Sequence, residues 1–398
     1  MIQDRSQVAL LALGTAVPSH RFQQAALGRW MAESLVMQPA LSRWIRRLYE
    51  LSGIETRYSC LPDPAAPPNM SRFAPGHPLA DVPTTSERMA IYQREATAIG
   101  TAAAYQALAE YGEGRLVAEV ADTVTHLIVV SCTGFFAPGL DQAIACQLNL
   151  RPTVERTLIG FMGCAAAFNA LRLASQIVSS RSSARVLIVC VETCSLHIQP
   201  GHDRINLVVA SLFADGAAAC LVGAPPSTHR DLFTLDSFYS EVAPDTEQEM
   251  VWQIGDYGFT LHLSPDIPRR LGAIAPRALA ALLADRPAPR FWAIHPGGRA
   301  IVDRLAELFD LAPEQAEPSL AVLRHYGNMS SPTILFVLHE LRERLRSDQT
   351  GDTVAGVAMA FGPGLVVEMA HLTYVPRLEA ALRQTIGAEI ELSDAYVA

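Results

Sequence analysis

Lysine is absent from this sequence: all 31 cationic residues among its 398 are arginines. The absence excludes Schiff-base chemistry, attachment of pyridoxal phosphate and a P-loop, because each needs a lysine amine. Any phosphate recognised by side-chain charge must therefore be bound by arginine. The formal net charge is −9, and no basic stretch is interleaved with aromatic residues. We therefore expect no nucleic-acid partner.

Signals for metal binding, secretion and membrane insertion are also missing. The seven cysteines include no CxxC pair and no His/Cys cluster with zinc spacing, so we expect no metal site. The number of cysteines is odd, and most of them lie in apolar runs, which indicates reduced thiols in a cytoplasmic protein. No apolar run reaches the roughly 20 residues of a membrane span, and residues 1–5 lack the start of a signal peptide. The sequence implies no metal or redox cofactor.

Hydrophobic periodicity and turn residues divide the chain into strands and helices. In the first half we predict strands at 8–13, 125–131, 184–191 and 217–222, and helices at 24–51, 86–111, 137–148 and 164–179. In the second half we predict strands at 291–294, 354–360 and 365–372, and helices ending at 309 and spanning 328–344. The proline-rich stretch 61–83 predicts a long surface excursion.

The two halves repeat the same order of elements. The turn carrying Cys164 corresponds to the turn carrying Asn328, and the turn after Val130 corresponds to the turn carrying His295. This repetition predicts an α/β fold of duplicated halves, residues 1–225 and 226–398, with two sheets and helices layered around a pseudo-two-fold axis.

Cys164 lies where an apolar run meets Gly163 and a long run of small residues and leucines begins. Such a segment predicts a strand that turns sharply into a buried helix, with the thiol at the helix N-terminus. Unpaired backbone N–H groups and the helix dipole favour a thiolate there. Cys164 could then form an acyl-enzyme. The alternative is a small buried cysteine that only packs.

Three further motifs lie in the second half. His295 ends a predicted strand and is followed by Pro-Gly-Gly, although a lone histidine is more often structural. Asn328 lies in Gly-Asn-Met-Ser-Ser, where it could instead cap the following helix. Phe361 begins Phe-Gly-Pro-Gly-Leu, which could be a simple hairpin turn.

In this order and spacing, the four motifs resemble those of type III polyketide synthases, the family that includes chalcone synthase. The resemblance extends over residues 8–375. It implies a thiolase-like fold with an αβαβα sandwich, a homodimer, and a catalytic set of Cys164, His295 and Asn328. His295 would form an ion pair with the Cys164 thiolate, and Cys164 would take an acyl group from a CoA thioester. After malonyl-CoA loses carbon dioxide, His295 and Asn328 would stabilise the enolate oxygen.

The same resemblance assigns the substrate cavity. Phe213 matches a gatekeeper phenylalanine of the family, whereas the second gatekeeper position holds Leu261. We also expect Phe361 to contact the substrate. Other cavity positions depart from the plant enzymes: Cys132, Thr133, Ala137, Cys194 and His197. The small residues Thr133, Ala137 and Cys194 look like those of bacterial alkylpyrone- and alkylresorcinol-type members. Small residues there suggest an acyl tunnel and a medium- or long-chain acyl starter.

Ring closure and CoA binding follow from the same comparison of motifs. In family members that form the product ring by aldol chemistry, a hydroxyl at the position of Cys132 acts with the groups at Glu192 and Ser330 to activate a water molecule. A thiol is a weak donor, so we favour an α-pyrone over a resorcinol. Arg57, Gly298 and Ala300 match positions that border the CoA tunnel, although Arg57 could equally form a surface salt bridge. Arg299 replaces a proline usual in that loop. The acyl donor could be CoA or an acyl carrier protein.

Three other functions remain open from the sequence. A β-ketoacyl carrier-protein synthase of the initiating type also uses Cys-His-Asn but performs one condensation. Hydroxymethylglutaryl-CoA synthase needs a glutamate base that we cannot place. An inactive acyl-binding homologue would fail to load an acyl group onto Cys164, whereas we expect Cys190 and Cys220 to be inert in any case.

Overall fold

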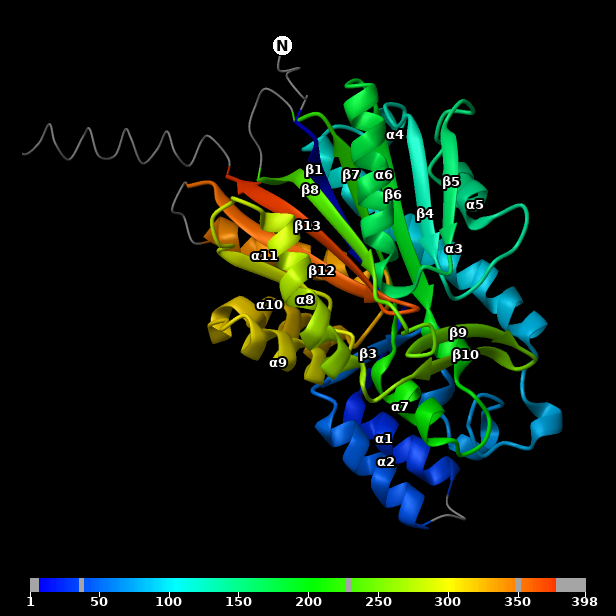
Figure 1. The fold of residues 1–398 in the computed structure, drawn as a ribbon. Coiled ribbons are helices and arrows are strands. Elements are labelled where there is room, and N and C mark those ends of the chain that lie inside the picture. Colours follow the sequence, from blue (N-terminus) through cyan, green and yellow to red (C-terminus); the bar gives the residue numbers. More distant parts are fainter. Residues whose placement is uncertain (1–6, 36–38, 226–230, 348–351, 377–398) are drawn as a thin grey trace, which may run out of the picture.

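A computed structural model describes residues 7–35, 39–225, 231–347 and 352–376 (Figure 1). Nine of the described strands form one sheet, in the order β11-β12-β13-β8-β1-β7-β6-β4-β5. These strands are β1 Ala9–Ala16, β4 His126–Ser131, β5 Glu155–Gly160, β6 Arg185–Thr193, β7 Asp215–Gly223, β8 Leu232–Val242, β11 Phe291–Ile294, β12 Val354–Gly362 and β13 Val366–Val375. Two two-stranded sheets lie apart from it: β2 His20–Gln23 with β3 Thr56–Ser59, and the hairpin of β9 Met250–Gly255 with β10 Gly258–Leu263.

The helices cover both faces of this sheet and the end of the molecule near β9 and β10 (Figure 1). They are α1 Gln24–Ser34, α2 Pro39–Leu51, α3 Thr85–Gly112, α4 Val117–Ala121, α5 Leu140–Gln147, α6 Ala166–Ser180, α7 Arg204–Leu212, α8 Ile267–Leu283, α9 Arg299–Leu308, α10 Pro313–Tyr326 and α11 Thr333–Ser347. None of the helices in the described ranges is long and apolar enough to cross a membrane.

Strand pairing shows the predicted duplication directly. In the first half β4 pairs in parallel with β6, and β6, β7 and β1 then pair antiparallel. In the second half β11 pairs in parallel with β12, and β12, β13 and β8 then pair antiparallel. The two predicted sheets are joined by two residue pairs between β1 and β8, Ala9 with Thr234 and Leu10 with Phe233.

Three hydrophobic cores separate five layers. Because side chains alternate along a strand, Val186 and Ile188 of β6 face α6 and α11 in the centre, whereas Leu187 and Val189 face α3 and α5 outside. In the second half, Ala358 of β12 faces the centre, and its neighbours face α8, α9 and α10. The αβαβα arrangement of a thiolase-like fold is therefore confirmed.

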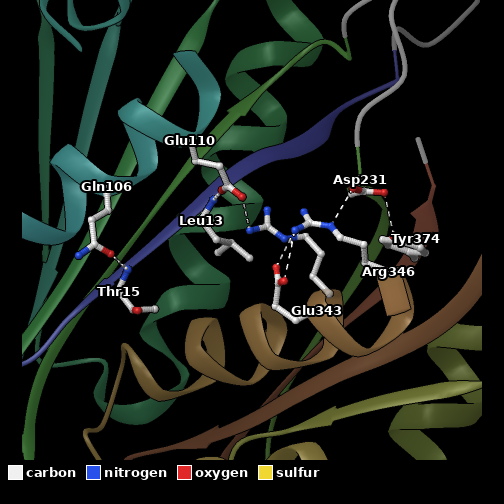
Figure 2. A network of polar contacts seen from close by, with 9 residues as sticks. Leu13, Thr15, Gln106, Glu110, Asp231, Glu343, Arg346 and Tyr374 are labelled. Carbon is white, nitrogen blue, oxygen red and sulfur yellow. Dashed lines mark hydrogen bonds and ion pairs between the residues drawn. The ribbon is translucent and has the colours of Figure 1, made fainter. Parts of the chain in front are cut away.

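A polar contact joins two of these layers where β1 and β8 separate (Figure 2). The backbone N–H of Leu13 donates to Glu110 of α3 at 2.7 Å, and that of Thr15 donates to Gln106 at 3.3 Å. Arg342 of α11 donates to the same Glu110 carboxylate from the other face of the sheet. Only a glycine fits at position 14, because a Cβ there would overlap the Ala103 carbonyl of α3.

Several predicted boundaries were wrong. The single helix expected at 24–51 is two helices, α1 and α2. The helix expected from 137 begins at Leu140, because Pro138 disfavours a helical Ala137. The helix expected from Asn328 begins at Thr333, after Pro332, so Asn328 is not its cap.

Other differences concern the excursion and the chain ends. The stretch 61–83 contains short 3₁₀ turns and buries Phe73 and Ala74, so it is only partly a surface loop. The boundary predicted between 225 and 226 adjoins residues 226–230, which are not described, and stays a prediction. The segment expected to lack a signal peptide and the outer ends of both halves, 1–6 and 377–398, also lie outside the described ranges.

Candidate active site

Cys164 lies in the 3₁₀ turn Gly163–Ala165, between the end of β5 and the start of α6. The Phe361–Leu365 turn of the second half packs directly on it. Gly163 has a φ of +64°, and a Cβ there would overlap Pro363. A Cβ at Gly362 would lie 2.9 Å from the Met162 carbonyl oxygen. The glycines and the proline of this motif therefore let one half of the chain position the nucleophile of the other.

The Cys164 side chain is 8% exposed, and its Sγ lies 3.6 Å from the Ser330 hydroxyl. Burial raises the pKa of Cys164 to about 11, and hydrogen bonds from Ser330 and Asn328 offset only part of that rise. The structure thus brings Cys164, Asn328 and Ser330 together, with Cys164 as a thiol.

His295 follows β11, where its backbone N–H donates to Met359 O at 2.9 Å. Its side chain is 1% exposed, and neither ring nitrogen has a hydrogen-bond partner within the described part of the chain. Burial lowers the pKa of His295 to about 3, so the imidazole is neutral. Burial disfavours both charged forms, and no hydrogen bond joins His295 to Cys164 in the described part of the chain, so the Cys164–His295 ion pair stays a prediction. An imidazole without partners at such depth indicates a functional role.

Asn328 is held from several directions. Its Nδ2 donates to Gly297 O at 3.1 Å, and its Oδ1 accepts from the Ser330 N–H at 2.8 Å. Its backbone forms a parallel bridge with Phe213 at the end of α7. One amide N–H of Asn328 is thus committed to the His295-Pro-Gly-Gly turn, and the second is left for another acceptor.

A cavity begins at Cys164 and extends towards α1. Its walls are mainly apolar. Eight of the predicted site residues line it: Arg57, Cys132, Thr133, Cys164, Cys194, His197, Phe213 and Leu261. All seven cysteines are free thiols, and three of them share this cavity.

Several predicted site residues do not line this cavity. Phe361 packs in the core of the second half, because residues alternate along β12 and this side chain faces outward. Ala137 is exposed to solvent. Gly298 and Ala300 lie at the start of α9, outside the lining. His295 and Asn328 are buried and also fall outside it.

Arg57 lines the cavity but is 7% exposed, unlike a surface phosphate ligand. Its Nη1 donates to the carbonyls of Ala210 and Phe213, at 2.7 and 2.6 Å. The guanidinium also lies over the Tyr49 ring, 5.4 Å from its centroid. These contacts give Arg57 a role in positioning Phe213. The alternative of a surface salt bridge does not fit a buried guanidinium, and the contact with CoA phosphates stays a prediction.

The β9–β10 hairpin is fixed to the turn after β4 by two side chains. His197 contacts Thr133 O at 2.7 Å and accepts from the Phe259 N–H, and burial lowers its pKa to about 3. Trp252 donates to Cys132 O at 2.7 Å. Sequence reasoning missed Trp252, because nothing in the local pattern marks a long-range contact of this kind.

Glu192 is fully buried behind the cavity, and burial raises its pKa to about 7. It accepts from the Cys132 N–H, the Thr133 hydroxyl and the Ser331 hydroxyl. Ser330, which the resemblance groups with Glu192 in aldol closure, contacts Cys164 here, and that grouping stays a prediction. The Cys132 Sγ accepts from the Gly163 N–H at 3.1 Å. Across the described residues, no group of three or more His, Cys, Asp or Glu is placed to hold a metal ion.

Comparisons with known proteins agree with this geometry. Residues 2–226 match the N-terminal domain, and residues 234–376 the C-terminal domain, of chalcone and stilbene synthases. The type III polyketide synthase domain of Steely1, a type I/III hybrid from Dictyostelium, is 25% identical with a TM-score of 0.82, covering 93% of this chain and 99% of that one. PKS-I of the brown alga Ectocarpus siliculosus is 28% identical with a TM-score of 0.83, covering 94% and 100%. The chain therefore belongs to the chalcone and stilbene synthase family, the type III polyketide synthases.

Proposed function

We propose that this enzyme loads a medium- or long-chain acyl group from acyl-CoA onto Cys164 and extends it repeatedly with malonyl-CoA. The observation that carries the proposal is the position of Cys164. Its thiol lies in the wall of a mainly apolar cavity, beside Asn328 and Ser330. The unpartnered imidazole of His295 lies buried in the motif to which Asn328 is bonded.

The first step is acyl transfer. Neutral His295 accepts the Cys164 proton as the sulfur attacks the thioester carbonyl, and the same proton leaves with the CoA thiol. A neutral base and a thiol are the forms that burial favours for these residues. The product is a thioester on Cys164.

The second step is decarboxylative condensation. Malonyl-CoA releases carbon dioxide, and its thioester oxygen gains negative charge, which His295 Nε2–H and the free N–H of Asn328 stabilise. The enolate carbon attacks the Cys164 thioester, and the Cys164 sulfur leaves. Phe213 and Leu261 add apolar surface to the same cavity, which disfavours the malonyl carboxylate and assists its loss.

We propose lactonisation of the finished chain to an alkyl α-pyrone, with a resorcinol as the other outcome. Aldol closure in the family uses a hydroxyl where this chain has Cys132. The Cys132 Sγ accepts a hydrogen bond from Gly163, and Glu192 bonds to Ser331 and Thr133. This arrangement supports release by an enol oxygen of the chain.

We also propose that the enzyme works as a homodimer in the cytoplasm, without a metal or redox cofactor. Strand β5 is the outermost strand of the described sheet, and most of its residues are exposed. Large apolar side chains lie exposed on it and beside it: Phe135, Leu158, Phe161 and Met162. An apolar strand edge of this kind favours pairing with a second copy. Light scattering of wild type and Leu158→Asp tests this, with dimer and monomer as the expected results.

The decisive experiment is mass spectrometry of products from malonyl-CoA and a ladder of acyl-CoA starters, with Cys164→Ala in parallel. Tri- and tetraketide pyrones that depend on Cys164 would support the proposal. Single-condensation β-ketoacyl products would favour the initiating carrier-protein synthase. If acyl carrier protein thioesters react and CoA esters do not, the donor assignment is overturned. An acyl group that never loads onto Cys164 would leave an acyl-binding homologue.

A further inference from the structure

The cavity has an arm that leads away from the catalytic residues into the helical part of the first half. Its walls there come from α1, α2 and the proline-rich stretch, at Leu27, Trp30, Met31, Tyr49 and Pro64. We refer to this part as the α1 arm. The three α1 residues are spaced i, i+3 and i+4, so they share one face of the helix. Figure 1 places α1 and α2 at the end of the molecule beside α7.

The polar groups along the α1 arm already have partners. Trp30 donates its indole N–H to Ala66 O at 2.9 Å, and the Tyr49 hydroxyl donates to Ala210 O at 3.1 Å. The Ser59 hydroxyl donates to Ser195 and accepts from the Leu61 N–H. An amide or phosphate in the arm would lose its water and find few groups to replace it. A hydrocarbon chain would lose nothing of this kind.

The two CoA positions carried over from the family lie elsewhere. Gly298 and Ala300 begin α9, and neither lines the cavity. Leu212, at the end of α7, is the side chain that a Cβ at Gly298 would meet, at 3.7 Å. Phe213 follows directly and lines the cavity.

We propose that the hydrocarbon chain of the Cys164 thioester lies in the α1 arm, and that Leu27 and Met31 determine the longest chain accepted. This inference rests on the proposed function, because it assumes acyl transfer to Cys164. Both side chains are buried, and Met31 is a flexible residue that can be replaced by a larger one or a smaller one. Each methylene that loses its place in the arm should cost about fourfold in binding.

The test uses three substitutions in α1. Met31→Trp fills the arm, Met31→Ala enlarges it, and Ala25→Trp introduces the same indole at an exposed position of the same helix. Intact-mass spectrometry measures loading of Cys164 with saturated acyl-CoA esters from butyryl to stearoyl. We expect Met31→Trp to reduce loading of the longest esters by about tenfold or more while butyryl loading is kept. Met31→Ala should extend the profile to longer chains, and Ala25→Trp should match wild type.

The outcomes separate this inference from the proposed function. Thermal denaturation of each variant identifies one that fails to fold, in which case Met31→Ala and Leu27→Ala decide the matter. An unchanged chain-length profile in folded Met31 variants, or an equal change in Ala25→Trp, would overturn the α1 arm while malonyl-dependent products still support the polyketide synthase. If wild type loads acyl groups with the expected profile but makes no malonyl-dependent product, the proposed function fails instead.

Discussion

The two halves of the molecule share one pattern of strand pairing but carry different chemistry at equivalent turns. After β4 and β5 the first half presents thiols, Cys132 and Cys164. After β11 and before α11 the second half presents His295 and Asn328. The duplicated scaffold therefore supplies a nucleophile from one half and the hydrogen-bonding groups around it from the other.

The difference extends to how the groups are held. Asn328 is fixed by side-chain hydrogen bonds to Gly297 and Ser330 and by backbone hydrogen bonds to Leu212 and Ala214, on either side of Phe213. The Cys164 side chain has a long contact to Ser330, at 3.6 Å, and its turn is shaped by the glycine-proline motif packed on it. A nucleophile must move through the reaction, whereas donors act best when they are already oriented.

The largest expected effect comes from removing the nucleophile of the first half. Cys164→Ala should abolish acyl loading and lower product formation by about 10³-fold or more, because Cys164 is the proposed point of acyl attachment. Intact-mass spectrometry and product analysis measure both. Cys190→Ala, on β6, is the control and should keep wild-type loading, since that thiol is fully buried. Continued loading of the Cys164→Ala protein would contradict the assignment.

Removing a donor of the second half should separate the two reaction steps. Asn328→Asp keeps the acceptor for the Ser330 N–H but loses the amide N–H groups. We expect condensation to fall by about 10²–10³-fold, with acyl loading reduced far less. Single-turnover measurements with preloaded enzyme compare the two steps. An equal loss in both would show that Asn328 mainly shapes the Cys164 turn.

The features that sequence could predict are those encoded locally. The strand Phe291–Ile294 is found as expected, and the Cys164 turn precedes a helix of small residues. The repeated order of elements led to the duplicated fold, because hydrophobic alternation is a property of each strand by itself. The motif Phe361–Leu365 was recognised in the sequence, but its contact with the Cys164 turn was not predicted.

The features that sequence could not predict depend on contacts between distant segments. Arg57 matches a position that borders the CoA tunnel in relatives. The structure adds hydrogen bonds from Arg57 to the carbonyls of Ala210 and Phe213, 153 and 156 residues further along the chain, which no local pattern could reveal. The contribution of α1 to the cavity carries no motif, since Leu27 and Met31 have the spacing of any buried helix face. The pKa shifts of Cys164 and His295, which oppose an ion pair between them, come from burial, and burial depends on the whole fold.

The two halves also differ in their buried glutamates, and this gives a stability test. Glu192 is bonded to uncharged groups, whereas Glu368 of β13 is bonded to both terminal nitrogens of Arg172. Because the pKa of Glu192 is raised from 4.5 to about 7, its contribution to stability is present below about pH 4.5 and lost as the pH rises through 7.

The free energy of unfolding of Glu192→Gln, relative to that of wild type, should therefore rise by about 1–3 kcal/mol from acidic to mildly alkaline pH, since glutamine cannot ionise. Denaturant unfolding at about pH 5 and about pH 8 measures the difference. Glu368→Gln is the matched control and should be less stable than wild type at the higher pH, because Arg172 loses its partner. A pH-independent difference between Glu192→Gln and wild type would show that Glu192 is ionised throughout.

The last prediction tests whether Cys164 of the first half and His295 of the second form an ion pair before substrate binds. With a pKa of about 11, Cys164 should be alkylated by iodoacetamide about tenfold faster for each pH unit between about pH 6 and about pH 9, because only the thiolate reacts. Peptide mass spectrometry follows Cys164, and exposed Cys146 reports on the reagent. A rate that is already constant below about pH 7 would mean that His295 holds a thiolate as its ion-pair partner. In that case the nucleophile would be activated by the fold itself, whereas a rising rate would assign its activation to the proton transfer to neutral His295 during acyl loading.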